Sequence, residues 1–217
     1  MKRNIILITG LAILFAYIES SFIVYLHNAC YGAGFDFPLK MMAMSAPWIE
    51  IGREFVSLLF ILMLAVLAAK HIRQIFAYAA LAFGLWDFFY YFWLYVFLGW
   101  PESLLSPDLL FLIPLPWTGP VLSPLLVSAA LVFIGLTLLI REVRGREPVH
   151  FNFYDRIGAL LSLALILLSY FWNAGRLHEP LSEMYYPWWI FTAGLITGLA
   201  VFIRKILFQG QADGKNT

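Results

Sequence analysis

Residues 84–100 read GLWDFFYYFWLYVFLGW, an aromatic and aliphatic run that contains one charged residue, Asp87. Together with the apolar residues before it, the run is long enough to cross a bilayer, which takes about 20 residues of α-helix. A carboxylate in the middle of a membrane span costs about 2.5–3.5 kcal/mol on insertion scales. The stretch therefore predicts a transmembrane helix in which Asp87 is a candidate functional residue.

The composition of the whole chain supports this interpretation. Hydrophobic residues make up 62% of the 217 residues and charged residues 12%, whereas soluble domains have about 45–50% and about 25%. We therefore predict an integral membrane protein in which residues 1–217 form a single transmembrane domain. The formal net charge of +1 gives no reason to expect a nucleic-acid partner, and the expected surroundings are the lipid bilayer.

Six apolar stretches are long enough to span a membrane. They cover residues 5–26, 48–69, 75–98, 120–140, 153–171 and 188–203. The first is interpreted as a retained helix and not as a cleaved signal peptide, because its apolar run continues past Glu19 to Leu26. The fold class predicted is all-α, a polytopic bundle of six transmembrane helices.

Basic residues indicate how the bundle is oriented. If the spans alternate in direction, one side of the membrane receives most of them: Lys2, Arg3, Lys70, Arg73, Arg141, Arg144, Arg146, Arg204 and Lys205. Lys40 and Arg176 fall on the opposite side. By the positive-inside rule we expect a multi-pass protein of the cell membrane with cytoplasmic N- and C-termini. The single cysteine, Cys30, is then extracytoplasmic.

The segment between the third and fourth spans carries signals for a further helix. Ser106, Pro107 and Asp108 are typical of a helix start, and Pro114 and Pro116 would end it. Because this helix is too short to cross the bilayer, we predict that it lies along the extracytoplasmic interface and covers whatever the spans enclose.

Acidic residues in the first three spans are the main candidates for function. All are expected in the outer half of the membrane: Glu19, Glu50, Glu54 and Asp87. Arg53 and Ser57 share a helix face with the two acids of the second span, and Tyr91 shares a face with Asp87. Since lipid cannot be what these faces contact, we expect them to surround one polar pocket.

The chemistry of this pocket is predicted from its donor atoms. Oxygen-rich carboxylate sets suit hard or borderline divalent metal ions, so Glu19, Glu50, Glu54 and Asp87 are the predicted metal ligands, and a divalent metal ion is the candidate cofactor. Acid–base or metal-assisted catalysis on a small or lipidic substrate would use Glu19, Arg53, Asp87 and Tyr91. Binding of a cation or polar head group without catalysis is equally compatible with the sequence.

Two other functions remain open at the level of sequence. A proton- or cation-coupled transporter would use the same carboxylates as a relay, but it should also carry polar residues through the inner half of the spans. An accessory or anchor subunit would bind partner subunits of a larger membrane complex. Gly194 and Gly198 form a GxxxG pattern, which favours close helix packing.

Overall fold

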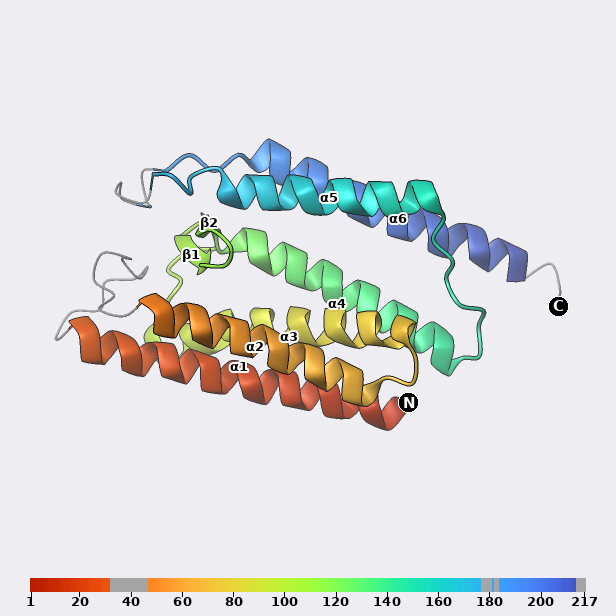
Figure 1. Cartoon of the computed structure of the whole chain (residues 1–217), viewed down its shortest axis with the longest axis horizontal. Coiled ribbons are helices and arrows are strands. Elements are labelled where there is room, and N and C mark those ends of the chain that lie inside the picture. Colours follow the sequence, from red (N-terminus) through yellow and green to blue (C-terminus); the bar gives the residue numbers. More distant parts are fainter. Residues whose placement is uncertain (32–46, 177–180, 182–183, 214–217) are drawn as a thin grey trace.

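The computed structural model describes residues 1–31, 47–176, 181 and 184–213. Within these residues, six helices are long and apolar enough to cross a membrane, which confirms the predicted all-α bundle of six spans. The start of α1 and the end of α6 lie at the same end of the bundle (Figure 1). We call this end the terminal end.

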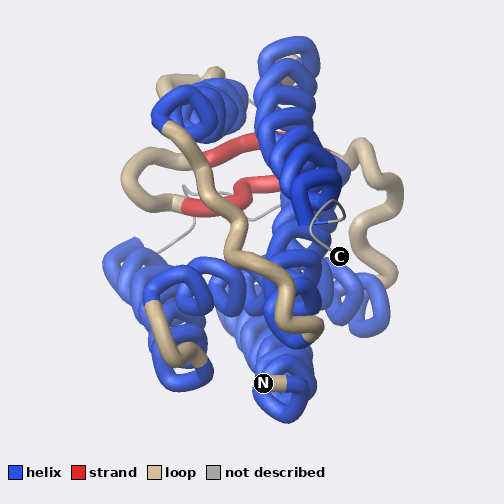
Figure 2. Tube along the Cα trace, turned by 90° about the vertical axis from the view of Figure 1, so that its right-hand side faces the viewer, coloured by secondary structure: helices blue, strands red, loops and turns tan. Residues whose placement is uncertain are grey.

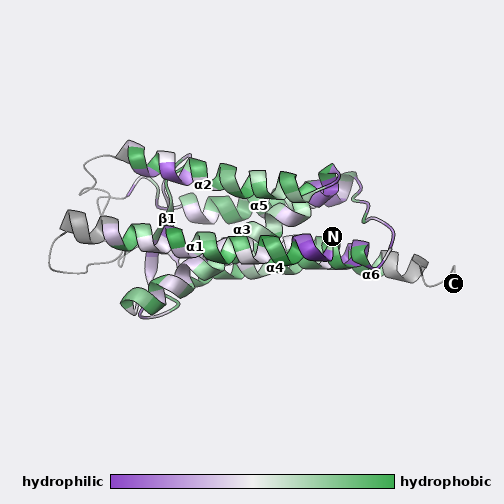
Figure 3. Cartoon of the chain, turned by 90° about the horizontal axis from the view of Figure 1, so that it is seen from below, coloured by the Kyte–Doolittle hydropathy of each residue, from purple (hydrophilic) through white to green (hydrophobic). Residues whose placement is uncertain are grey.

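The helices follow the predicted spans closely. Their bounds are α1 Lys2–Tyr31, α2 Pro47–Ala68, α3 Ile72–Leu98, α4 Leu122–Val143, α5 Phe153–Phe171 and α6 Trp188–Asp213. Hydrophobic residues cover most of the helix lengths, and hydrophilic residues gather toward the helix ends (Figure 3). Two positions used in the orientation argument, Lys40 and the side chain of Cys30, lie outside the described residues.

The predicted interfacial helix is wrong. Residues Pro107–Phe111 form strand β1, which pairs antiparallel with β2, Trp117–Pro120. The prolines at 107, 114 and 116 restrict only the ends of the segment, so they permit a helix as well as a hairpin. A helix this short would leave most of its backbone groups without partners, whereas the hairpin pairs many of them internally. We call this side of the bundle the hairpin end.

The helices form two groups. Helix α3 packs against α1, α2 and α4, while α5 packs mainly against α6. The β1–β2 hairpin lies between the α5–α6 pair and helices α1 to α3, as the views from the side and from the terminal end both show (Figures 1 and 2). Strand β2 contacts α5, so the hairpin connects the two groups.

Glycines allow the closest helix crossings. A Cβ atom on Gly84 of α3 would lie 2.6 Å from the carbonyl oxygen of Ser128 in α4, and one on Gly135 of α4 would lie 2.7 Å from that of Ala77. Between α5 and α6, a Cβ on Gly198 would lie 2.5 Å from Ser162 Oγ. The GxxxG pattern of α6 therefore serves helix packing, as predicted.

Candidate functional site at the hairpin end

Arg53 joins α1 and α2 near the hairpin end. Its guanidinium forms ion pairs with Glu50, three residues earlier on α2, and with Glu19 of α1. Ser57, one turn further along α2, donates a hydrogen bond to Glu19 Oε1 at 2.9 Å. Both carboxylates are 6% exposed. The predicted stripe of polar residues on α2 thus contacts Glu19, and one cation serves two buried anions.

Glu54 has a different partner. Its two carboxylate oxygens accept the backbone N–H of Leu112, with N···O distances of 3.1 and 2.9 Å. Leu112 follows strand β1 directly. Glu54 therefore fastens the β1–β2 hairpin to helix α2.

Asp87 and Tyr91 also make separate contacts. Ser128 Oγ of α4 donates to Asp87 Oδ2 at 2.6 Å, deep in the α3–α4 contact. Tyr91 OH donates to Asp108 Oδ2 of strand β1 at 2.9 Å. Asp87 and Tyr91 lie one turn apart on α3, yet Asp87 contacts α4 and Tyr91 contacts the hairpin.

The predicted metal site finds no support in this geometry. In the described part of the chain there is no group of three or more His, Cys, Asp or Glu side chains placed to hold a metal ion. The sequence places the four acids at similar depths, but depth does not fix the direction in which each side chain points. Glu19 and Glu50 contact Arg53, Glu54 contacts the hairpin, and Asp87 contacts Ser128 of α4. The catalytic roles of Glu19, Arg53, Asp87 and Tyr91 stay predictions.

A pocket of about 350 Å³ lies beside the hairpin. We call it the hairpin pocket. Its lining comes from the hairpin segment and from the α5–α6 connection: Leu105, Pro107, Asp108, Thr118, Gly119, Pro120, Asn173, Leu181, Met184, Tyr185, Tyr186 and Trp188. None of the predicted site residues lines this pocket, which is therefore a different site from the one that the sequence predicted.

Three buried polar side chains in the hairpin pocket carry oxygen acceptors. Asp108 is 5% exposed, Thr118 3% and Asn173 2%. Asn173 Nδ2 donates to the carbonyl oxygen of Tyr185 at 3.0 Å, which leaves Oδ1 as its acceptor. Among the described residues, neither Asn173 Oδ1 nor Thr118 Oγ1 has a hydrogen-bond partner. Buried polar atoms are rarely left without a partner unless a ligand or water supplies one.

The surroundings of Asp108 disfavour its charged form. Burial raises the pKa of the Asp108 carboxyl to about 6, the nearby carboxylate of Asp87 adds to this rise, and the hydrogen bonds from Tyr91 and the Leu109 N–H oppose it. Asp108 is therefore mostly ionised at neutral pH and can be neutralised by a proton or by a bound cation.

Aromatic rings form another wall of the hairpin pocket. The rings of Tyr186 and Trp188 meet edge to face with centroids 5.0 Å apart. Burial raises the pKa of Tyr186 to about 12, so this wall stays neutral at physiological pH. Electron-rich ring faces attract cations, an effect of about 0.5–2 kcal/mol depending on desolvation.

Sequence reasoning did not select the acceptors of the hairpin pocket. Asp108 was interpreted as part of a helix start, and Asn173 follows the fifth span, where polarity is expected. The prolines at 107, 114 and 116 mark the ends of the segment but do not distinguish a short helix from a hairpin. The meeting of Asn173 with the hairpin depends on long-range packing, which no local pattern encodes.

Comparisons of the chain with protein-family models, with curated proteins and with solved structures found no match.

Proposed function

We propose that this is a multi-pass protein of the cell membrane that binds a small ammonium group, free or as part of a polar head group, in the hairpin pocket. The observation that carries the proposal is the combination of the buried Asp108 carboxylate with two acceptors, Thr118 Oγ1 and Asn173 Oδ1, that lack hydrogen-bond partners. A primary ammonium has three N–H donors and no acceptor, which matches three acceptor groups once small side-chain shifts open the two buried oxygens to the pocket.

The charge distribution around the pocket favours a cation over an anion. Arg53 is engaged by Glu19 and Glu50, whereas Asp87 and Asp108 accept hydrogen bonds from the neutral groups of Ser128 and Tyr91. Two carboxylates near each other in a poorly solvated region repel one another when both are ionised. A bound cation would relieve this repulsion, and the neutral aromatic wall would add to its binding.

The pocket is proposed to open on the extracytoplasmic side. The terminal end carries the lysines and arginines that the positive-inside rule assigns to the cytoplasm. The hairpin end would then face outward, where a ligand from outside the cell or from the outer leaflet can reach the pocket.

Calorimetric titration of the purified protein in detergent tests the proposal with three probes that share a two-carbon skeleton. Ethanolamine carries a primary ammonium, choline carries a quaternary ammonium without N–H donors, and ethylene glycol is neutral. We expect affinity to fall in that order. Below the pKa of about 6 for Asp108 a proton competes with the ligand, so ethanolamine should bind roughly tenfold more weakly at pH 5 than at pH 8.

A matched pair of variants locates the effect. Asp108→Asn should lose the preference for ethanolamine over ethylene glycol and the pH dependence with it. Glu102→Gln removes an exposed acid of the same segment that does not line the pocket, and it should behave like the wild type. Equal binding of the three probes, or an unchanged preference in Asp108→Asn, would overturn the proposal.

A further inference from the structure

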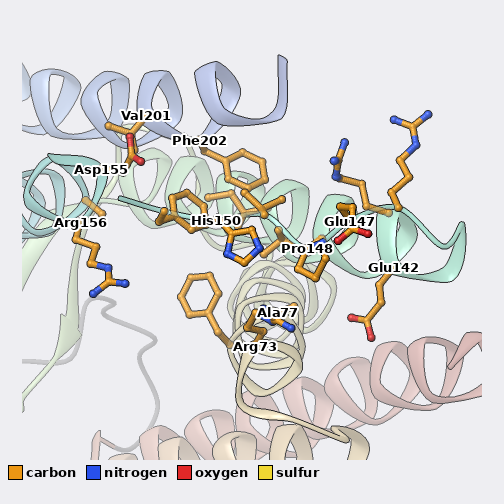
Figure 4. A pocket seen from close by; sticks show the side chains of 18 of the residues that line it. Arg73, Ala77, Glu142, Glu147, Pro148, His150, Asp155, Arg156, Val201 and Phe202 are labelled. Carbon is orange, nitrogen blue, oxygen red and sulfur yellow. The ribbon is translucent and has the colours of Figure 1, made fainter. Parts of the chain in front are cut away.

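A second and larger cavity, of about 720 Å³, lies at the terminal end. Its walls come from α3, α4, α5, α6 and the segment that joins α4 to α5. Figure 4 shows His150 of that segment near the middle, with Phe202 of α6 on one side of it and Ala77 and Arg73 of α3 on the other. Helix α4 packs against α3 and makes few contacts with α6, so the two helix groups leave room for a cavity between them.

The cavity has one apolar wall and one basic rim. The apolar wall is formed by residues from within the membrane spans: Phe76, Ala77, Ile134, Leu138, Ala159, Val201 and Phe202. The basic rim lies at the helix ends and in the connecting segment, and it consists of Arg73, Arg141, Arg146, Arg156, His71 and His150. From residue 153 at the start of α5 to Ser162 in the lining, the helix rises about 14 Å.

Three acidic residues line the cavity: Glu142, Glu147 and Asp155. Asp155 accepts hydrogen bonds from Arg204 and Lys205 of α6, at 2.5 and 2.7 Å, and from the backbone N–H of Asn152. Glu142 accepts from Gln74 Nε2 at 2.6 Å and lies 3.1 Å from His71 Nε2. The rim thus carries four arginines against three acids, and one of these acids, Asp155, is already paired with Arg204 and Lys205.

We infer that this cavity binds an anionic phospholipid of the leaflet at the terminal end, with the phosphate at the basic rim and an acyl chain along the apolar wall. Arginine presents a planar set of donors that matches phosphate oxygens. Basic pockets between transmembrane helices at the cytoplasmic boundary are suited to anionic head groups. A soluble phosphate would contact the rim but not the apolar wall, and a free hydrocarbon would contact the wall but not the arginines. A phospholipid contacts both.

The rim and the wall can be tested separately by counting bound lipids with native mass spectrometry, using phosphatidylglycerol, phosphatidylcholine and glycerol 3-phosphate as probes. Phosphatidylglycerol should bind most tightly, phosphatidylcholine less tightly because its head group carries a compensating positive charge, and glycerol 3-phosphate weakly because it lacks acyl chains. Tight binding of glycerol 3-phosphate would identify a soluble phosphate as the ligand and overturn the lipid assignment.

The role of the basic rim is tested by a double variant, and a second double variant that removes the same number of arginines elsewhere is its control. Arg146→Gln combined with Arg156→Gln should weaken phosphatidylglycerol binding about fivefold for each arginine removed. Arg3→Gln combined with Arg144→Gln removes the same charge at the same end from residues that do not line the cavity, and it should change binding little. Equal losses in the two pairs would reduce the effect to general surface charge and contradict a built site.

The role of the apolar wall is tested by a second pair of variants. Ala159→Trp would fill the cavity, while Leu160→Trp places the same ring at an exposed neighbouring position outside the lining. Only Ala159→Trp should lower lipid occupancy, and both variants should keep the thermal stability of the wild type in detergent. Full lipid occupancy in Ala159→Trp would overturn the inference even if the rim variants had failed to fold.

Discussion

Arg53 is the residue whose removal should have the largest effect on stability. It is paired with two carboxylates, Glu19 and Glu50, that are each 6% exposed. Replacing it with methionine keeps much of the apolar stem but leaves two buried anions without their cation. Breaking a buried ion pair on one side costs about 3–5 kcal/mol. We expect Arg53→Met to lower the thermal unfolding temperature in detergent strongly.

The loss of stability in Arg53→Met should come from the two carboxylates left without a cation, so neutralising these carboxylates should restore stability. A triple variant that adds Glu19→Gln and Glu50→Gln to Arg53→Met should recover most of the lost stability, because amides are far less costly to bury than carboxylates. If the triple variant unfolds at the same temperature as Arg53→Met alone, the charge argument fails and lost packing is the better explanation.

At the residue scale, the sequence predicted contacts along one helix but not between elements. The positions of Glu50, Arg53 and Ser57 follow from helical spacing, and the structure confirms that they share a face. The choice of Glu19 as their partner, and of Asp108 as the partner of Tyr91, depends on how α1 and the hairpin are placed. One sequence contains no local signal for such placement.

The β1–β2 hairpin is the element that differs most from the sequence prediction. Predicting a helix over Ser106–Ile113 relied on cap residues, which indicate where a helix could start but supply little energy compared with pairing of backbone groups. Once the segment is a hairpin, Glu54 becomes the acceptor for Leu112 N–H and Asp108 becomes part of a pocket.

Glu54 should hold the hairpin through hydrogen bonding and not through its charge. Glu54→Gln keeps a carbonyl oxygen that can accept the Leu112 N–H, so stability should change little. Glu54→Leu leaves that N–H buried without a partner, at a cost of about 1–3 kcal/mol. Hydrogen exchange followed by mass spectrometry should show faster exchange across residues 107–120 in Glu54→Leu alone. Equal protection in both variants would mean that the hairpin is held by other contacts.

For the whole molecule, hydropathy alone was sufficient to predict the helices, because each span is a local run of apolar residues and the bilayer fixes its length. It could not predict that α5 and α6 form a pair set apart from α3 and α4. In the α5–α6 pair, Gly194 and Gly198 of α6 pack closely against Ser162 of α5. In the other group, Gly84 and Gly135 allow α3 and α4 to cross closely. The terminal-end cavity exists because of this division.

Orientation in the membrane is the property of the whole molecule on which both proposals depend. Two exposed positions report on opposite ends: Glu102 in the segment before the hairpin and Arg144 after α4. In a Cys30→Ser background, a membrane-impermeant thiol reagent applied to intact cells, or to spheroplasts where an outer membrane blocks access, should label Glu102→Cys. Arg144→Cys should react only after the membrane is permeabilised, because the positive-inside rule predicts that the end with the clustered arginines and lysines is cytoplasmic. The reverse pattern would place the hairpin pocket inside the cell and the lipid cavity in the outer leaflet, and labelling of both positions in intact cells would show a mixed topology.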